Sequence, residues 1–136
     1  MRIAFGADDE NETTRAVLAY LSSRGEVTVL DPPSWPDLGA EVGRSVANGL
    51  ADVGVVMCWT GTGTAIAANK VPGVRAALAW DPWIARGARL WNDANVLALS
   101  LKRLAPDVAV ETVQAFLDHP EPDPAEAAAI ARLKEL

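Results

Sequence analysis

Short apolar runs alternate along the chain with longer segments whose apolar residues recur every three or four positions. A short apolar run between polar turns is typical of a buried strand. The run at residues 53–57 shows no polar alternation, as expected of a strand that is covered on both faces. The predicted strands are residues 3–6, 27–30, 53–57, 74–79 and 95–99.

The segments between these runs have helical spacing. Val42, Val46 and Leu50 recur at i, i+4 and i+8 after Pro36, a residue that suits the first turn of a helix. A similar pattern before Gly25 predicts a helix that this glycine closes. Helices are predicted at residues 10–24, around 42–50, from the glycine turn to about 70, from 82 until residues 92–94 break it, from 106 through 117, and at 125–136.

The helix that begins at Pro82 is expected to bury one face and to leave its arginines in solvent. Asp81 is its N-cap candidate. The apolar residues expected inside are Ile84, Ala88 and Leu90, and the arginines expected outside are Arg86 and Arg89.

Strands that alternate with helices predict an α/β domain, because parallel strands need helical crossovers. The expected architecture is a three-layer α/β/α domain with a five-stranded, mainly parallel, Rossmann-like sheet. The sequence contains no internal repeat and no linker, so residues 1–136 are expected to form a single domain.

Composition narrows the class of protein. Half of the 136 residues are hydrophobic and 22% are charged, as in globular proteins. The net charge of −6 argues against a nucleic-acid partner or an acidic membrane surface. We see no secretory leader and no apolar run long enough to cross a bilayer, so we expect no membrane partner and a cytoplasmic location.

The counts of cysteine and histidine limit the chemistry. One cysteine cannot form an internal disulfide, which fits a reducing compartment. One histidine, His119, cannot supply a histidine metal cluster or a Ser-His-Asp triad within one chain. We therefore expect no metal and no cofactor.

Residues 55–70 carry the most specific chemical signal. An apolar run ends in Cys58, a turn with Gly61 and Gly63 follows, and a helix of small residues comes next. A helix N-terminus offers backbone N–H donors and partial positive charge, which favour an anion or a developing oxyanion. The same field can make a thiol a usable base. The alternative is a small buried core cysteine beside glycines that only close a tight turn.

Residues that follow the strands are the candidate ligand contacts, because ligands of parallel sheets bind outside the carboxyl ends of the strands. Asp8 and Asp9 follow the first strand and could act as helix caps or as ligand contacts. The other positions of this kind are Ser34, Trp35, Cys58 through Gly63, Trp80, Asp81 and Ser100.

Four tryptophans are expected near the same edge: Trp59, Trp80, Trp83 and Trp91. They form either a second apolar core or the wall of a pocket that uses stacking in place of charge.

Four segments together resemble one known family in order and spacing: residues 3–8 (IAFGAD), 60–70 (TGTGTAIAANK), 74–77 (VRAA) and 92–98 (NDANVLA). On these segments the chain resembles the ribose-5-phosphate isomerase B family, which includes galactose-6-phosphate isomerase subunits. The similarity runs from the first strand to about Leu117.

The resemblance implies an aldose–ketose isomerase that works through an enediolate, in a dimer whose active sites are shared between two chains. It implies that Cys58 is the base and that the hydroxyl of Thr60 assists it. It also implies that the backbone of the glycine turn holds the oxyanion, that Asp8 contacts sugar hydroxyls and that Asn92 lies near the reacting end. The full set of expected substrate contacts is Asp8, Asp9, Trp59, Gly61, Thr62, Gly63, Thr64, Trp91 and Asn92.

The chain departs from the family pattern at the positions that open and grip a sugar phosphate. Asp9 and Trp91 stand where the family has histidines, and Trp59 stands where it has glycine. Alanines at 125 and 129 stand where it has arginines for the phosphate. Bidentate arginine contacts are hard to replace, so ribose 5-phosphate is a doubtful substrate.

Two hypotheses follow from these departures. In the first, the chain is an isomerase that acts on a carbohydrate-like small molecule other than ribose 5-phosphate, as a homodimer or higher homo-oligomer. In the second, it is a catalytically inactive binding or scaffold subunit that pairs with an active homologue in a hetero-oligomer. Another reaction of the same enolate chemistry, such as epimerisation, has no feature in the sequence that selects it.

Overall fold

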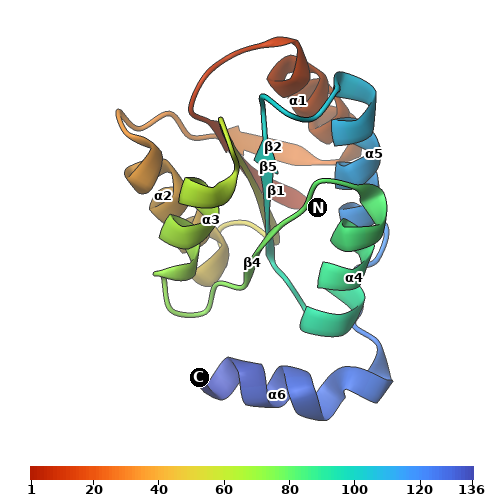
Figure 1. Ribbon diagram of the computed structural model, residues 1–136. Coiled ribbons are helices and arrows are strands. Elements are labelled where there is room, and N and C mark those ends of the chain that lie inside the picture. The colour runs from red at the N-terminus through yellow and green to blue at the C-terminus, as the bar shows by residue number, and fades with distance from the viewer.

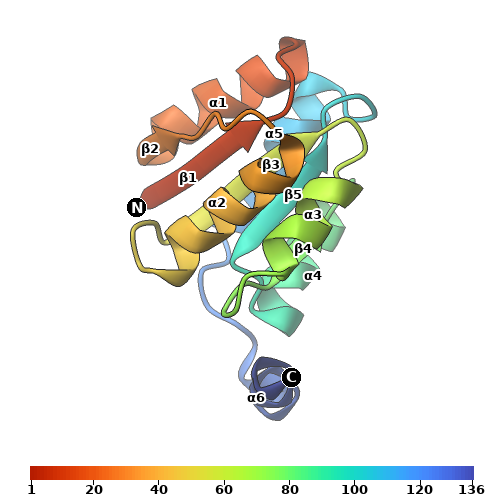
Figure 2. The ribbon, with the colours of Figure 1, turned by 90° about the vertical axis from the view of Figure 1, so that its left-hand side faces the viewer.

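The computed structural model describes residues 1–136 and contains a five-stranded sheet with helices on both faces (Figures 1 and 2). The strand order is β2-β1-β3-β5-β4, and every neighbouring pair is parallel. The predicted three-layer α/β/α architecture is confirmed. The strands are β1 (Arg2–Ala7), β2 (Glu26–Val29), β3 (Val53–Cys58), β4 (Ala76–Leu78) and β5 (Val96–Ser100).

Two helices cover one face of the sheet and three cover the other (Figure 1). The first pair is α2 (Trp35–Ala47) and α3 (Thr62–Asn69). The helices of the second face are α1 (Glu12–Arg24), α4 (Pro82–Asn92) and α5 (Pro106–Leu117).

The sheet separates two apolar cores. Side chains of successive strand residues point to opposite faces, so Ile3 and Phe5 enter the core under α1 and α5 while Ala4 enters the core under α2 and α3. Because both faces are covered, β3 and β5 are buried at every residue. This explains the uninterrupted apolar run in the sequence of β3.

Polar caps fix where the helices begin. The side chain of Asn11 accepts from the backbone N–H of Thr14, and the Thr14 hydroxyl accepts from the backbone N–H of Asn11. This reciprocal cap starts α1 at Glu12, two residues later than predicted. The side chains of Ser34 and Asp81 cap α2 and α4 by accepting from the backbone N–H groups of Asp37 and Ile84, without the reciprocal bond.

The edge strand β4 is shorter than predicted. It spans Ala76–Leu78, whereas the apolar pattern predicted residues 74–79. The backbone N–H of Val74 turns back to the carbonyl of Val71, and that of Arg75 donates to the side chain of Asn95. Only the carbonyl of Arg75 bonds the neighbouring strand, so the strand register begins at Ala76.

The structure corrects the prediction that Arg89 lies in solvent. Its side chain is buried, with only 8% of the residue exposed, and it donates to the backbone carbonyls of Ala94, His119 and Pro120. The guanidinium also lies over the ring of Phe116, 5.1 Å from its centre. Burial lowers the pKa of Arg89 from its ordinary value. Arg86 is exposed, as predicted.

The C-terminal segment leaves the sheet and passes beyond α4 (Figure 1). It begins with a 3₁₀ turn, Pro124–Glu126, and continues as α6 (Ala127–Glu135). Ile130 is the only buried residue of α6, and Leu133 and Leu136 are exposed. None of the helices has the length and apolar character that crossing a bilayer requires.

Candidate functional site

The topology places a ligand crevice between the carboxyl ends of β1 and β3. The chain leaves β1 toward β2 on one side and leaves β3 toward β4 on the other, so the connections diverge between these two strands. Ligands of open α/β sheets bind at such a switch point. Asp8 follows β1 and Cys58 ends β3, so the sequence candidates meet at this place.

Backbone hydrogen bonds tie the strand ends together around Cys58. The backbone N–H of Asp8 donates to the carbonyl of Met57 at 2.9 Å, and that of Leu101 donates to the carbonyl of Cys58 at 2.9 Å. The hydroxyl of Ser100 donates to the carbonyl of Trp59 at 2.6 Å. The thiol therefore stands on a rigid platform made by three neighbouring strands.

The thiol of Cys58 is nearly covered and has one polar partner. Six per cent of the residue is exposed, and the hydroxyl of the buried Thr64 donates to its sulfur at 3.3 Å. The hydroxyl of Thr60, expected to assist the thiol, instead lies 2.6 Å from the hydroxyl of Thr62. Thr64, and not Thr60, therefore forms the hydrogen bond with the sulfur of Cys58.

The turn after Cys58 requires glycine at position 61. Gly61 has a φ of +79°, a left-handed conformation that disfavours a side chain. A Cβ at this position would also lie 2.6 Å from Cδ1 of Leu78 and 2.9 Å from the carbonyl carbon of Leu99. The tight turn lets α3 begin directly beside Cys58.

The start of α3 presents free backbone donors. The backbone N–H groups of Gly63 and Thr64 donate to no group of the chain, because they lie in the first turn of the helix and no side chain caps it. The N–H of Thr62 is directed at the hydroxyl of Thr60 at 3.3 Å. Free donors at a helix N-terminus can stabilise a negative oxygen.

A surface hollow of about 370 Å³ opens over the thiol, and we call it the Cys58 hollow. Its lining combines two indoles, two hydroxyls and one carboxylate around the sulfur. The lining residues are Asp8, Trp35, Cys58, Trp59, Thr60, Thr62 and Gly63.

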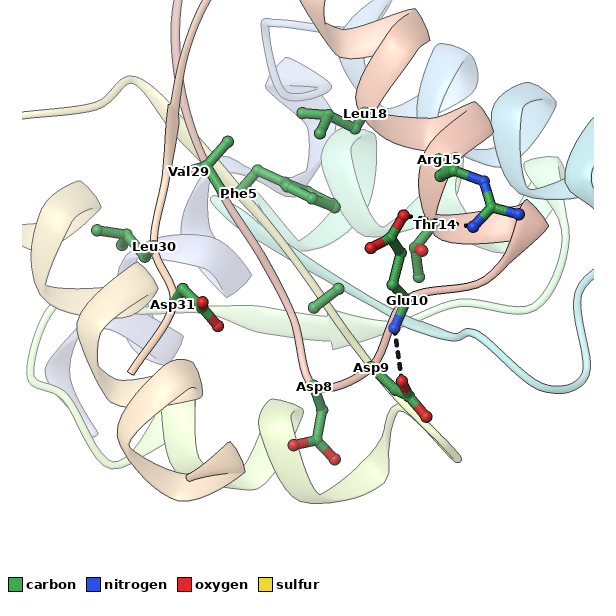
Figure 3. A pocket seen from close by; sticks show the side chains of 11 residues that line it. Phe5, Asp8, Asp9, Glu10, Thr14, Arg15, Leu18, Val29, Leu30 and Asp31 are labelled. Atoms are coloured by element: carbon green, nitrogen blue, oxygen red, sulfur yellow. Dashed lines mark hydrogen bonds and ion pairs between the residues drawn. The ribbon is translucent and has the colours of Figure 1, made fainter. Parts of the chain in front are cut away.

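A second hollow, of about 380 Å³, lies beside the first, where the carboxyl ends of β1 and β2 meet the start of α1 (Figure 3). Asp8 lines both hollows, whereas Asp9 lines only the second. The carboxylate of Asp9 accepts from the backbone N–H of Glu10 at 2.8 Å, and Glu10 pairs with Arg15 at 3.3 Å (Figure 3). Asp9 is therefore held as a local turn cap, while Asp8 has access to a ligand over Cys58.

Trp91 and Asn92 lie at the opposite end of the same protomer. Helix α4 runs antiparallel to the strands, starting after the carboxyl end of β4 and ending before the amino end of β5. Asn92, the last residue of α4, lines a hollow with Arg75 and Leu133. One chain alone does not bring these residues to Cys58.

The tryptophans expected at one edge are also separated. Trp83 and Trp91 contact each other edge to face, with ring centres 5.6 Å apart. Trp80 is exposed and lines neither hollow beside Cys58. Of the four, only Trp59 reaches the Cys58 hollow, where Trp35 joins it.

Trp35 was a candidate ligand contact only through its position after the second strand, and the side chain of Thr64 had no predicted role. Trp35 directly follows a strand-to-helix loop, which was its only signal. It reaches the site because α2 and α3 approach closely: a Cβ at Gly39 of α2 would lie 2.6 Å from the carbonyl oxygen of Thr64.

No group of three histidine, cysteine, aspartate or glutamate side chains could hold a metal ion.

Comparison with known proteins identifies the family. A sequence model described as Ribose/Galactose Isomerase matches residues 3–134, almost the whole chain. The chain belongs to the ribose/galactose isomerase family. The resemblance predicted from the sequence is confirmed, and so is the prediction that the protein is an isomerase.

Individual members of the ribose/galactose isomerase family are similar over most of their length. The chain is 36% identical to ribose-5-phosphate isomerase B of Escherichia coli over 124 residues, covering 85% of this chain and 83% of that protein. It is 35% identical to D-erythrulose-4-phosphate isomerase of Pectobacterium atrosepticum over 127 residues, covering 87% and 83%. The structure of ribose-5-phosphate isomerase B from Clostridium thermocellum superimposes with a TM-score of 0.91 at 35% identity, covering 99% of this chain and 96% of that one.

Proposed function

We propose that the protein is an aldose–ketose isomerase that acts through an enediolate, with Cys58 as the base and with a substrate other than ribose 5-phosphate. The observation that carries this proposal is the thiol at the floor of the Cys58 hollow, next to free backbone N–H groups at the start of α3. Proton abstraction beside a carbonyl needs a base and a set of donors where negative charge develops.

The reaction moves protons without net oxidation. The thiolate of Cys58 takes the proton from the carbon next to the carbonyl, and the electron pair of that C–H bond moves to give an enediolate. The N–H groups of Gly63 and Thr64 stabilise the resulting oxygen anion. The proton returns to the neighbouring carbon while the hydroxyl and carbonyl oxygens exchange their proton, so an aldose becomes a ketose.

The choice of substrate follows from the residues that replace the family pattern. The resemblance assigns phosphate binding to the C-terminal segment, where this chain has Ala125 and Ala129. It assigns ring opening to a histidine where this chain has Trp91. We infer that the substrate is a sugar that opens readily without enzymatic help and carries no phosphate at that place.

We also propose that a second copy of the chain completes the site. Asn92 lies at the opposite end of the protomer from Cys58, so it can act on the same substrate only from a second copy. The resemblance to a family with shared active sites supports a homodimer of this kind.

Hydrogen exchange at carbon tests the proposed reaction. The protein is incubated in heavy water with D-ribose, D-erythrulose and their phosphates, and proton NMR follows loss of the C–H signal beside the carbonyl. We expect exchange with an uncharged sugar and a loss of roughly 100-fold or more in Cys58→Ala. Ile66→Ala, a change at an exposed position of α3, is the matched control and should retain the wild-type rate.

Two results would contradict the proposal. Exchange at the wild-type rate in Cys58→Ala would remove Cys58 as the base. Absence of exchange with every sugar, in a protein whose thermal unfolding shows a folded state, would remove the isomerase reaction on these substrates.

A further inference from the structure

We propose that Trp35 and Trp59 form an aromatic wall that binds the carbon skeleton of an uncharged sugar over Cys58. The proposal rests on the proposed function, because it names the substrate class of the same site. It assigns a role in substrate choice to Trp35, the first residue of α2. The other residues of the hollow follow β1 or lie between the end of β3 and the start of α3.

Both indoles are exposed at the same hollow. Trp35 is 47% exposed at the start of α2, and Trp59 is 50% exposed in the turn between β3 and α3. Both line the Cys58 hollow. Two large apolar rings left open to solvent at one concave place mark a binding surface.

Trp35 is held in position by its contact with α3. A Cβ added at Gly63 would lie 2.9 Å from Cζ3 and 3.0 Å from Cε3 of the Trp35 ring, so the indole rests directly on this glycine. Gly63 thus serves two purposes, since its N–H is a free donor and its missing side chain leaves room for the ring.

Trp59 has one contact at its backbone and one at its ring. The hydroxyl of Ser100 holds its carbonyl at 2.6 Å, and the ammonium group of Lys102 lies 5.8 Å from the centre of its ring. A cation over an indole is attracted by the negative face of the ring and limits its movement. Both indoles therefore have contacts that favour the positions in which they line the hollow.

The other groups of the hollow select the ligand chemistry. The hydroxyls of Thr60 and Thr62 and the carboxylate of Asp8 can bond sugar hydroxyls, and the lining contains no cationic side chain. The charged side chain inside the hollow is Asp8, whose carboxylate would repel a phosphate, and the one cation beside it, Lys102, lies against the ring of Trp59 outside the lining. The C–H face of a sugar chain can pack on indole rings while its hydroxyls reach the polar groups, so an uncharged aldose or ketose fits best.

NMR of the indole groups tests this wall. The five tryptophans give five indole N–H signals, which Trp→Phe variants assign. D-ribose, D-erythrulose and ribose 5-phosphate are titrated in turn. We expect the uncharged sugars to shift the signals of Trp35 and Trp59 but not that of Trp80, which is more exposed than either and lies outside the hollow.

Variants separate the wall from a general effect on folding. We expect Trp35→Ala and Trp59→Ala to weaken binding of D-ribose by roughly tenfold, Trp35→Phe and Trp59→Phe to retain most of it, and Trp80→Ala to leave it unchanged. Binding that is unaffected by both alanine variants would overturn the proposal. So would binding of ribose 5-phosphate that is tighter than that of D-ribose and insensitive to the same variants.

The outcome is distinct from that of the exchange experiment. If sugars shift the two indole signals but no carbon-bound proton exchanges, the result supports the aromatic wall and contradicts the isomerase proposal. If exchange proceeds in Trp35→Ala and Trp59→Ala with unchanged KM and kcat, the result supports the isomerase proposal and contradicts the aromatic wall.

Discussion

Thr64 can serve the thiol of Cys58 in both of its protonation states. Its hydroxyl lies 3.3 Å from the sulfur and 3.4 Å from the carbonyl oxygen of Gly61. It can donate to the thiolate, or it can donate to the carbonyl and accept from the S–H group. Both residues are buried, so water does not replace this partner easily.

Removal of this hydroxyl tests its role. Thr64→Val keeps the shape of the side chain and deletes the donor, and we expect the exchange rate at carbon to fall roughly tenfold, as for loss of one hydrogen bond. Thr64→Ser keeps the hydroxyl and is the matched control, which should retain most of the rate. Equal rates in the two variants would show that the base does not depend on this contact.

At the scale of elements, contacts between residues that are near in the sequence could be predicted, whereas contacts between residues far apart in the sequence could not. Cys58, the glycine turn and the start of α3 are adjacent in the chain, so their arrangement could be predicted from strand and turn signals. Trp35 meets Gly63 only because α2 and α3 lie side by side, and no local pattern shows this. Arg89 is likewise buried by a segment thirty residues further on, which accepts its hydrogen bonds.

The buried Arg89 holds the segment that leads to α6. It bonds the carbonyls of His119 and Pro120, so its loss leaves these acceptors unpaired and frees the link to α6. We expect Arg89→Met to lower the free energy of unfolding by about 2–3 kcal/mol in urea titrations and to speed proteolysis after residue 118. Arg86→Met, on the same helix, removes only an exposed hydrogen bond of 3.3 Å to the ring of His119 and should stay within about 0.5 kcal/mol of the wild type. Similar values for both variants would contradict this assignment.

At the scale of the whole molecule, the direction of the elements explains which expected site residues separate. Every strand of the sheet runs the same way, and α4 returns against them. A helix that begins at the ligand edge must therefore end at the other edge, which carries Asn92 away from Cys58. The order of elements in the sequence implied this separation. The spacing of the motifs alone did not imply it, because spacing does not show in which direction each helix or strand runs.

Complementation between two inactive variants tests whether two copies share each site. If Asn92 of one copy acts at Cys58 of the other, a mixed dimer of Cys58→Ala and Asn92→Ala contains one site with both changes and one site with none. Random mixing gives half mixed dimers, so we expect about one quarter of the wild-type exchange rate after unfolding and refolding the variants together. Sedimentation would report the dimer independently of activity. A mixture no more active than either variant alone, in a protein that sediments as a dimer, would show that each chain carries a site of its own or that Asn92 acts elsewhere.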